Sequence, residues 1–131
     1  MKKLKGLIIV LSILLSLFGL TACGGDNNNS YEQITAQEAK TIMDIESDYI
    51  IIDARTTEEF AEGHIEDAIL IPEYEIADRA EKELPDKEQK VLVYCRSGRR
   101  SKIASEELVK LGYTNVKEFG GIIDWPYKTV K

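Results

Sequence analysis

Residues 91–103 decide the fold, and they read Val-Leu-Val-Tyr-Cys-Arg-Ser-Gly-Arg-Arg-Ser-Lys-Ile. The unbroken apolar run Val91–Tyr94 predicts a strand that is covered on both faces. A short polar loop follows, and apolar side chains then recur at helical spacing, at Ile103, Ala104, Leu108 and Leu111. A buried strand, a tight loop and an amphipathic helix in succession are typical of a parallel α/β sheet.

The same alternation extends toward the N-terminus. Tyr49–Ile52 and Ala68–Ile71 are apolar runs rich in β-branched residues, and we expect each of them to form a buried strand. Pro72 ends the second run, and proline suits the first turn of a helix. We therefore expect a helix with apolar residues spaced over 76–84.

Two helix starts are marked by capping boxes, in which a threonine oxygen and a glutamate three residues later satisfy free backbone N–H groups. Thr35–Glu38 opens a helix that we expect to run to about Met43, and Thr56–Glu59 opens a short helix that Gly63 ends. The 131 residues leave room for one domain. The sequence therefore predicts a single α/β domain whose central, mostly parallel sheet has helices on both faces.

The N-terminal residues have the layout of a signal peptide. Three lysines precede the uncharged stretch Leu7–Leu20. This stretch is short for a permanent membrane helix, which needs roughly 20 apolar residues, although an uncleaved helix is the alternative. It ends in Leu-Thr-Ala-Cys at 20–23, which resembles the lipobox of bacterial lipoproteins. The resemblance implies that residues 1–22 are removed and that Cys23 is diacylated.

Residues 24–30, Gly-Gly-Asp-Asn-Asn-Asn-Ser, contain nothing to bury and indicate a flexible tether. The expected organisation is a lipoprotein signal peptide at 1–22, the lipidated cysteine and tether at 23–30, and the domain at 31–131. Two acyl chains give stable membrane anchoring. We expect an extracytoplasmic lipoprotein, on the outer face of the cytoplasmic membrane or in the periplasm at an outer membrane.

The charge balance and the cysteine count exclude several classes of protein. The chain has 17 basic and 23 acidic residues, and removal of the three lysines of the signal segment leaves 14 basic ones and a net charge of −9. Nucleic-acid binding needs a basic face, so we expect no nucleic-acid partner. One histidine and two cysteines cannot supply a four-ligand Cys/His zinc site or several disulfides, and we expect neither a metal nor a cofactor.

Cys95 is the residue from which we expect chemistry. It follows a predicted strand directly, and ligands of open α/β sheets bind beyond the carboxyl ends of the strands. The loop amides and the helix start after it favour an anion, and three arginines within residues 96–100 add positive charge. Such surroundings favour the nucleophilic thiolate. The alternative is that Cys95 is a small buried apolar side chain.

Residues 95–101 resemble the active-site loop of the rhodanese, or thiosulfate sulfurtransferase, family. The resemblance covers about Ile34 to Tyr127 and includes three further blocks: Asp53–Arg55 with Glu59 and Phe60; Gly63–Ile65 with Ala68, Ile71 and Pro72; and Gly120–Ile122 with Trp125.

The resemblance implies a single rhodanese-like domain that works through a persulfide. Cys95 takes the sulfane sulfur of thiosulfate or a similar anion and passes it to a thiol or to cyanide. The substrate-binding loop would then consist of Arg96, Ser97, Gly98, Arg99 and Arg100. We expect Arg100 to bind the sulfonate oxygens and the other two arginines to steer anions to the site. We also expect a monomer.

Two other functions remain open on the sequence. A rhodanese-like domain also serves as a non-enzymatic sulfane-sulfur carrier or a partner-binding module. Cysteine-based phosphatases, like arsenate reductases, are a second class, but phosphatases place an arginine six residues after the nucleophile, where this chain has Ser101. The three arginines of the loop favour an inorganic sulfane donor over mercaptopyruvate.

The only histidine, His64, lies in a predicted turn, and we expect it to be structural. Asp53 and Arg55 are expected to form an ion pair that supports the site, and Trp125 and Tyr127 to cover the core.

Overall fold

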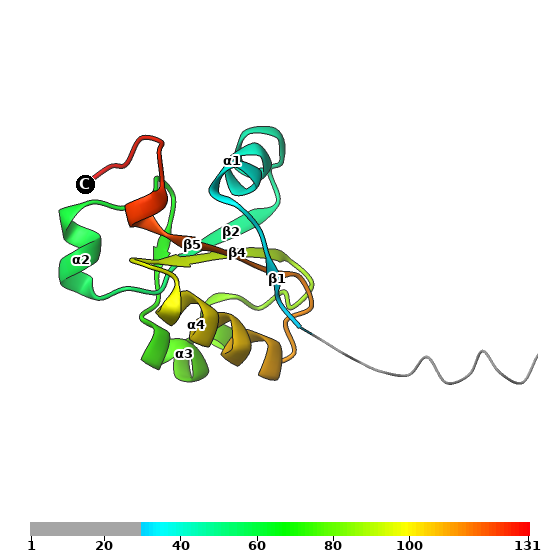
Figure 1. Ribbon diagram of the computed structural model, residues 1–131. Helices are drawn as coiled ribbons and strands as arrows, with labels where there is room; N and C mark the ends of the chain where they lie inside the picture. Colours follow the sequence, from blue (N-terminus) through cyan, green and yellow to red (C-terminus); the bar gives the residue numbers. More distant parts are fainter. Residues whose placement is uncertain (1–29) are drawn as a thin grey trace, which may run out of the picture.

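The computed structural model describes residues 30–131, which form one sheet of five parallel strands in the order β1-β5-β4-β2-β3 (Figure 1). The strands are β1 Glu32–Gln33, β2 Tyr49–Asp53, β3 Ile69–Leu70, β4 Lys90–Cys95 and β5 Val116–Gly121. The predicted signal segment, Cys23 and all of the tether before Ser30 lie outside the described residues. No helix within 30–131 has the length and apolar character needed to cross a membrane.

Helices cover both faces of the sheet (Figure 1). The helices are α1 Ala36–Ile45, α2 Thr57–Glu62, α3 Ile76–Glu83 and α4 Arg99–Lys110, with the 3₁₀ turns η1 Glu73–Glu75 and η2 Ile122–Asp124. Helix α1 lies on one face, α3 and α4 lie on the other, and α2 stands beside the C-terminal segment. The predicted α/β class and the sheet with helices on both faces are confirmed.

Both predicted capping boxes are present. The Thr35 Oγ1 atom accepts a hydrogen bond from the Glu38 N–H at 3.0 Å, and the Thr35 N–H donates to the Glu38 carboxylate at 2.8 Å. Thr56 and Glu59 make the same pair of contacts at the start of α2, and Gly63 follows its last turn. The backbone N–H groups at the start of α1 and α2 are thus satisfied locally, which is why these short segments begin where the sequence predicts.

The prediction for residues 68–76 is wrong in two details. The expected buried strand is reduced to the two residues of β3 at the edge of the sheet, where the Ile69 side chain is 37% exposed. An edge strand has only one neighbour, so an apolar run does not guarantee burial. Pro72 has an extended ψ of 146° and lies outside the helix, and η1 separates it from α3.

Strands β1 and β5 were not predicted. Strand β5 pairs with both β1 and β4, yet its sequence Val-Lys-Glu-Phe-Gly-Gly has neither an apolar run nor a regular alternation. Tertiary contacts on both sides therefore overcome a weak local preference for strand.

The sheet divides the core into two layers, and β4 contributes to both. Val91, Val93 and Cys95 belong to the layer under α3 and α4, whereas Leu92 and Tyr94 belong to the layer under α1. All five side chains are at most 1% exposed. The pleat of β4 therefore directs the predicted nucleophile toward α4 and its neighbour Tyr94 to the opposite face.

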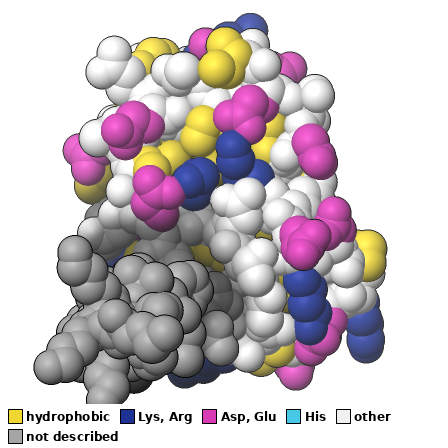
Figure 2. Space-filling model, turned by 90° about the vertical axis from the view of Figure 1, so that its right-hand side faces the viewer, with side chains coloured by type: hydrophobic (Ala, Val, Ile, Leu, Met, Phe, Trp, Pro, Cys, Tyr) yellow, Lys and Arg dark blue, Asp and Glu magenta, His cyan; other side chains and the backbone are white. Residues whose placement is uncertain are grey.

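The side of the molecule away from α2 carries mixed charges (Figure 2). Acidic and basic side chains are interspersed there. Ion pairs such as Lys90–Glu46 and Lys117–Glu32 join residues from different elements. Exposed pairs of this kind contribute little to stability.

Candidate active site

Cys95 is the last residue of β4, and its Sγ atom lies at the head of α4. The Gly98 N–H donates a hydrogen bond to this sulfur at 3.0 Å, and the side chain is 1% exposed. Gly98 precedes α4 and has a φ of +110°, a left-handed conformation that glycine adopts without strain. The turn at Gly98 thereby aims a backbone N–H at the sulfur, and the N-terminal end of α4 favours negative charge nearby.

The loop 96–98 rests directly on the end of β5. The Ile123 N–H donates to the Arg96 carbonyl oxygen at 3.2 Å, and Cys95 pairs with Gly121 in the sheet. A Cβ atom at Gly121 would lie 1.9 Å from that carbonyl oxygen, so the loop occupies the space that any other side chain would need. Gly121 therefore permits the close approach of the two backbones.

The structure brings all five predicted loop residues together but gives the arginines different surroundings. Arg96 and Arg99 are exposed, and their side chains make no ion pair within residues 30–131. Ser97 is also exposed, whereas Gly98 is buried. The Arg100 guanidinium binds both carboxylate oxygens of Glu59, at 2.6 and 2.9 Å. Two arginines are therefore available to an incoming anion, and the arginine that we expect to bind the sulfonate is held by α2.

The Arg100–Glu59 pair has a strong electrostatic signature. The hydrogen bond from Arg100 lowers the pKa of Glu59 from its ordinary value of 4.5 to about 2. The same pair raises the pKa of Arg100, to which the nearby Cys95 also contributes. Glu59 is already the second member of the capping box of α2, so one carboxylate joins the start of α2 to the active-site loop.

Glu59 makes the free energy of unfolding depend on pH in the acidic range. Because its pKa is lower in the folded state, the ion pair stabilises the fold above about pH 4.5, and this contribution is lost as the pH falls toward 2. Glu59→Gln keeps a capping-box residue and is expected to cost about 1 kcal/mol at neutral pH. The difference from the wild type should shrink between pH 4.5 and pH 2 in urea unfolding.

A matched control is available for this measurement in Glu58, which is exposed and makes no ion pair within the described part of the chain. Glu58→Gln should change the free energy of unfolding little and without this pH dependence. A Glu59→Gln cost that is the same at both ends of the range would contradict the assignment.

Sequence reasoning assigned no role in the site to two residues beside the sulfur, Ser101 and Glu118. The Ser101 hydroxyl lies 3.4 Å from the Cys95 Sγ atom, and it donates to the buried carboxylate of Glu118 at 2.6 Å. Ser101 is fully buried, and Glu118 is 3% exposed. The sequence signal for Glu118 was its position between the apolar residues Val116 and Phe119. Because no strand was predicted there, Glu118 could not be assigned to the inward face of a sheet.

A buried network supports the carboxyl ends of β2 and β4. The Arg55 guanidinium binds the Asp53 carboxylate at 2.7 Å and also donates to the Gly63 carbonyl oxygen at 2.7 Å. The Tyr94 hydroxyl donates to Asp53 at 2.7 Å and accepts from the Ile65 N–H at 3.1 Å. The predicted Asp53–Arg55 ion pair is confirmed, and it ties the loop before β3 to the central strands.

His64 contacts Phe60 and Val130. Its ring stacks on Phe60 with centroids 3.7 Å apart, and its Nδ1 atom lies 3.0 Å from the Phe60 carbonyl oxygen. Its backbone forms a bridge to Val130. These contacts agree with the structural role expected of His64. Trp125 contacts the rings of Phe119 and Tyr127 in the layer under α1, as expected for core cover.

Two hollows of about 270 and 360 Å³ lie beside the loop, between α2 and the segment that follows β5. Arg55, Glu59, Glu62 and Ile122 line both of them. Arg96 and the 62% exposed Ile123 complete the smaller hollow. The surface next to the active-site loop is therefore concave, with charged and apolar groups on its walls.

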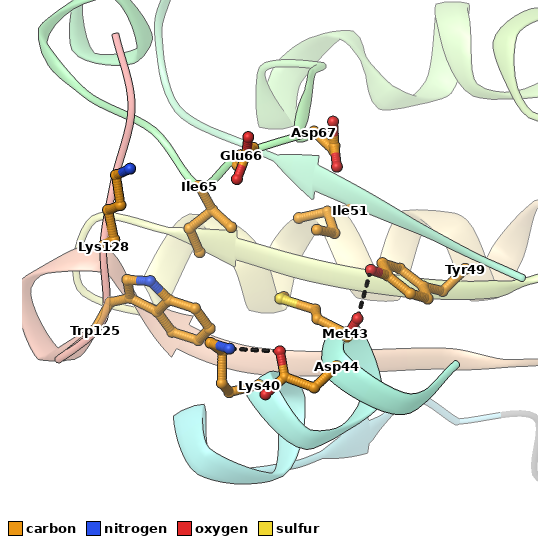
Figure 3. A pocket seen from close by; sticks show the side chains of 10 residues that line it. All are labelled: Lys40, Met43, Asp44, Tyr49, Ile51, Ile65, Glu66, Asp67, Trp125 and Lys128. Carbon is orange, nitrogen blue, oxygen red and sulfur yellow. Dashed lines mark hydrogen bonds and ion pairs between the residues drawn. The ribbon is translucent and has the colours of Figure 1, made fainter. Parts of the chain in front are cut away.

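Another hollow, of about 300 Å³, lies on the opposite face of the sheet (Figure 3). Met43 and Asp44 of α1 line it together with Ile51 of β2 and Trp125. Ile51 and Trp125 belong to the core layer under α1, whereas Cys95 faces α4. This hollow is therefore separated from the nucleophile by the sheet.

Comparison with known proteins agrees with this geometry. Residues 35–126 match the family model described as a rhodanese-like domain. The chain is 41% identical over 80 residues to the thiosulfate sulfurtransferase PspE of Escherichia coli K12, covering 61% of this chain and 77% of that protein. It is 32% identical over 105 residues to the putative sulfur carrier protein YrkF of Bacillus subtilis 168, covering 79% of this chain and 56% of that protein.

A solved structure titled "rhodanese with anions from E. coli" superimposes with a TM-score of 0.60 at 40% identity. The superposition covers 63% of this chain and 98% of that one. The family model, the sequence relatives and the solved structure agree, and the chain belongs to the rhodanese-like domain family.

Proposed function

We propose that this protein is a sulfurtransferase that moves sulfane sulfur from thiosulfate, or a similar donor, to a thiophilic acceptor through a persulfide on Cys95. The observation that carries the proposal is the position of Sγ at the head of α4, where the Gly98 N–H points at it. A single thiol that accepts a backbone N–H at a helix start suits an anionic sulfur species.

The proposed reaction has two steps. The Cys95 thiolate attacks the outer sulfur of thiosulfate, the S–S bond of the donor breaks, and sulfite leaves with the bonding electron pair. The persulfide sulfur then lies within the loop, whose backbone N–H groups stabilise its charge. A thiol or cyanide attacks that outer sulfur, and Cys95 departs as the thiolate.

In this proposal the three arginines have different roles. Arg96 and Arg99 attract the anion, since their side chains are exposed and make no ion pair within residues 30–131. Arg100 contacts the sulfonate oxygens after its guanidinium releases Glu59. While it remains paired with Glu59, it contributes positive charge near the site. In the structure Ser101, six residues after the nucleophile, binds Glu118 and supplies no cation, which disfavours a phosphatase or arsenate reductase.

A sulfane-sulfur carrier is the second candidate, because YrkF, a relative, is named a putative sulfur carrier protein. Incubation with thiosulfate and then with cyanide, and in parallel with a panel of thiols, distinguishes the two. We expect repeated turnover, measured as thiocyanate or as acceptor persulfide. A mass increase of one sulfur atom on Cys95 without turnover to any acceptor would favour the carrier.

We also propose that the mature chain is a lipoprotein anchored outside the cytoplasm through Cys23. The support is the sequence layout of residues 1–23, which precede the described domain. After expression in a bacterium, the protein is expected to partition into the detergent phase of a Triton X-114 separation, and Cys23→Ser should move it to the aqueous phase. Partition of the wild type into water would refute the anchor.

A further inference from the structure

Glu118 is a buried acid beside the active-site loop to which the reaction above assigns no role. Its side chain on β5 is 3% exposed. One carboxylate oxygen accepts hydrogen bonds from Ser101 Oγ at 2.6 Å and from the Gly120 N–H at 2.8 Å. Burial of a carboxylate is costly and persists only where such partners compensate for lost water.

The register of β5 gives Glu118 this position. Glu118 pairs with Val93, whose side chain belongs to the layer under α3 and α4, so the carboxylate lies on the same side of the sheet as Cys95. A β-bulge follows, because Cys95, two residues after Val93, pairs with Gly121, three residues after Glu118. The Gly120 N–H that binds Glu118 belongs to this bulge.

Ser101 lies between Glu118 and the sulfur. Its hydroxyl has a single hydrogen, and the acceptor of that hydrogen determines how Ser101 interacts with the sulfur. The possible acceptors are the Glu118 carboxylate at 2.6 Å and the Gly98 and Gly120 carbonyl oxygens at 2.9 and 3.4 Å. The carboxylate is both the nearest and the charged acceptor, so it takes the hydrogen. The Ser101 oxygen therefore presents a lone pair to Cys95 Sγ at 3.4 Å, and the thiol hydrogen points at Ser101.

We propose that Glu118 is a positioning residue which acts through Ser101 to hold the free Cys95 thiol in its protonated form. This inference rests on the proposed role of Cys95 as the nucleophile. Two effects of Glu118 oppose the thiolate: it keeps the Ser101 hydrogen away from the sulfur, and its own negative charge is buried nearby.

Other groups around the pair act in both directions. The Gly98 N–H and the Arg100 guanidinium favour negative charge on the sulfur, and Glu59 partly neutralises Arg100. Burial raises the pKa of Tyr31, and the charges of Glu106 and Glu118 raise it further. Glu118 is thus the acid that faces the sulfur through a hydrogen-bonded neighbour.

A protonated Cys95 thiol would be less prone to oxidation. Oxidation of cysteine follows its thiolate character, and a sulfenic acid is recovered most readily through a second thiol. Cys95 is the only cysteine of residues 30–131. Glu118 would therefore protect the unloaded protein from irreversible oxidation at the cost of some reactivity near neutral pH.

The test is Glu118→Gln, which keeps an oxygen acceptor for Ser101 and removes the charge. We expect alkylation of Cys95 by iodoacetamide at pH 7 to be about fivefold to tenfold faster than in the wild type. The pH profile should move to lower pH, and the two rates should converge at alkaline pH, where both thiols are ionised. Thermal unfolding by circular dichroism establishes that the variant is folded.

Glu106→Gln is the matched control, because the charge of Glu106 also raises the pKa of Tyr31 but its side chain is exposed and makes no hydrogen bond to Ser101. It should leave the alkylation rate unchanged. An unchanged or slower rate in Glu118→Gln would overturn the proposal, and a slower one would assign Glu118 as the base that accepts the thiol proton.

Ser101→Ala tests whether the effect passes through Ser101. It removes the acceptor of the thiol hydrogen, so it should accelerate alkylation by itself. Glu118→Gln should then add a smaller effect than in the wild-type background, because only the buried charge of Glu118 still acts on the sulfur. A full effect of Glu118→Gln in that background would refute the role of Ser101. Alkylation requires no sulfur transfer, so these results stand apart from the outcome of the turnover assay.

Discussion

Cys95→Ser is expected to abolish sulfur transfer, with a loss of at least about a thousandfold in turnover of thiosulfate. A serine hydroxyl is almost entirely protonated at neutral pH and forms no persulfide, so neither half of the reaction has a substitute. The replacement is nearly isosteric, and the Gly98 N–H that donates to the sulfur would meet an oxygen in its place. The fold should therefore remain intact, and the loss should be chemical.

The measurement combines thiocyanate formation with the intact mass after incubation with thiosulfate. The wild type should gain one sulfur atom on Cys95, and Cys95→Ser should gain none. Cys23→Ser, which alters the other cysteine of the chain, is the control and should retain full turnover. Residual turnover of Cys95→Ser near that of the wild type would refute the persulfide mechanism.

Gly121→Ala is expected to disable the site without touching any reactive group. Its Cβ would lie 1.9 Å from the Arg96 carbonyl oxygen and 2.6 Å from the Ser97 Cα atom, so the active-site loop or the end of β5 must move. A displacement of about 1 Å costs roughly a hundredfold in rate. We expect that loss in kcat/KM, with a cost of about 1–3 kcal/mol in the free energy of unfolding.

Gly120→Ala separates this steric effect from backbone strain. Gly120 has a φ of +86°, but nothing lies within 4 Å of a Cβ atom built there. Its cost should be about 1–2 kcal/mol from the left-handed conformation alone, with a much smaller loss of kcat/KM. Equal losses of kcat/KM in both variants would contradict the steric explanation. Turnover and urea unfolding of the two proteins give the comparison.

The parts of the fold that the sequence predicts well are those with local causes. Thr35 and Thr56 begin their helices because their oxygens and the following glutamates satisfy backbone groups within four residues. Strands β2 and β4 are unbroken apolar runs because both of their faces are covered. The length of the edge strand β3 was overestimated, and the weakly patterned β5 was missed. Whether these segments form strands depends on pairing partners that are distant in sequence.

The candidate site divides in the same way. Cys95, its glycine turn and its arginines are contiguous, so the strand, loop and helix pattern alone brings them together. Glu59 and Glu118 come from α2 and β5, and each reaches the loop only through the packing of the whole domain. Residues far apart along the chain meet by tertiary contacts that no local pattern records.

The sequence by itself determined the α/β class, the place of Cys95 at the carboxyl end of β4 and the cluster of arginines that follows it, because each depends on neighbouring residues. Only the tertiary structure decided which acids approach that loop. Glu59 holds Arg100, and Glu118 binds the serine next to the sulfur, because the position of α2 and the register of β5 against β4 bring these carboxylates within hydrogen-bonding distance.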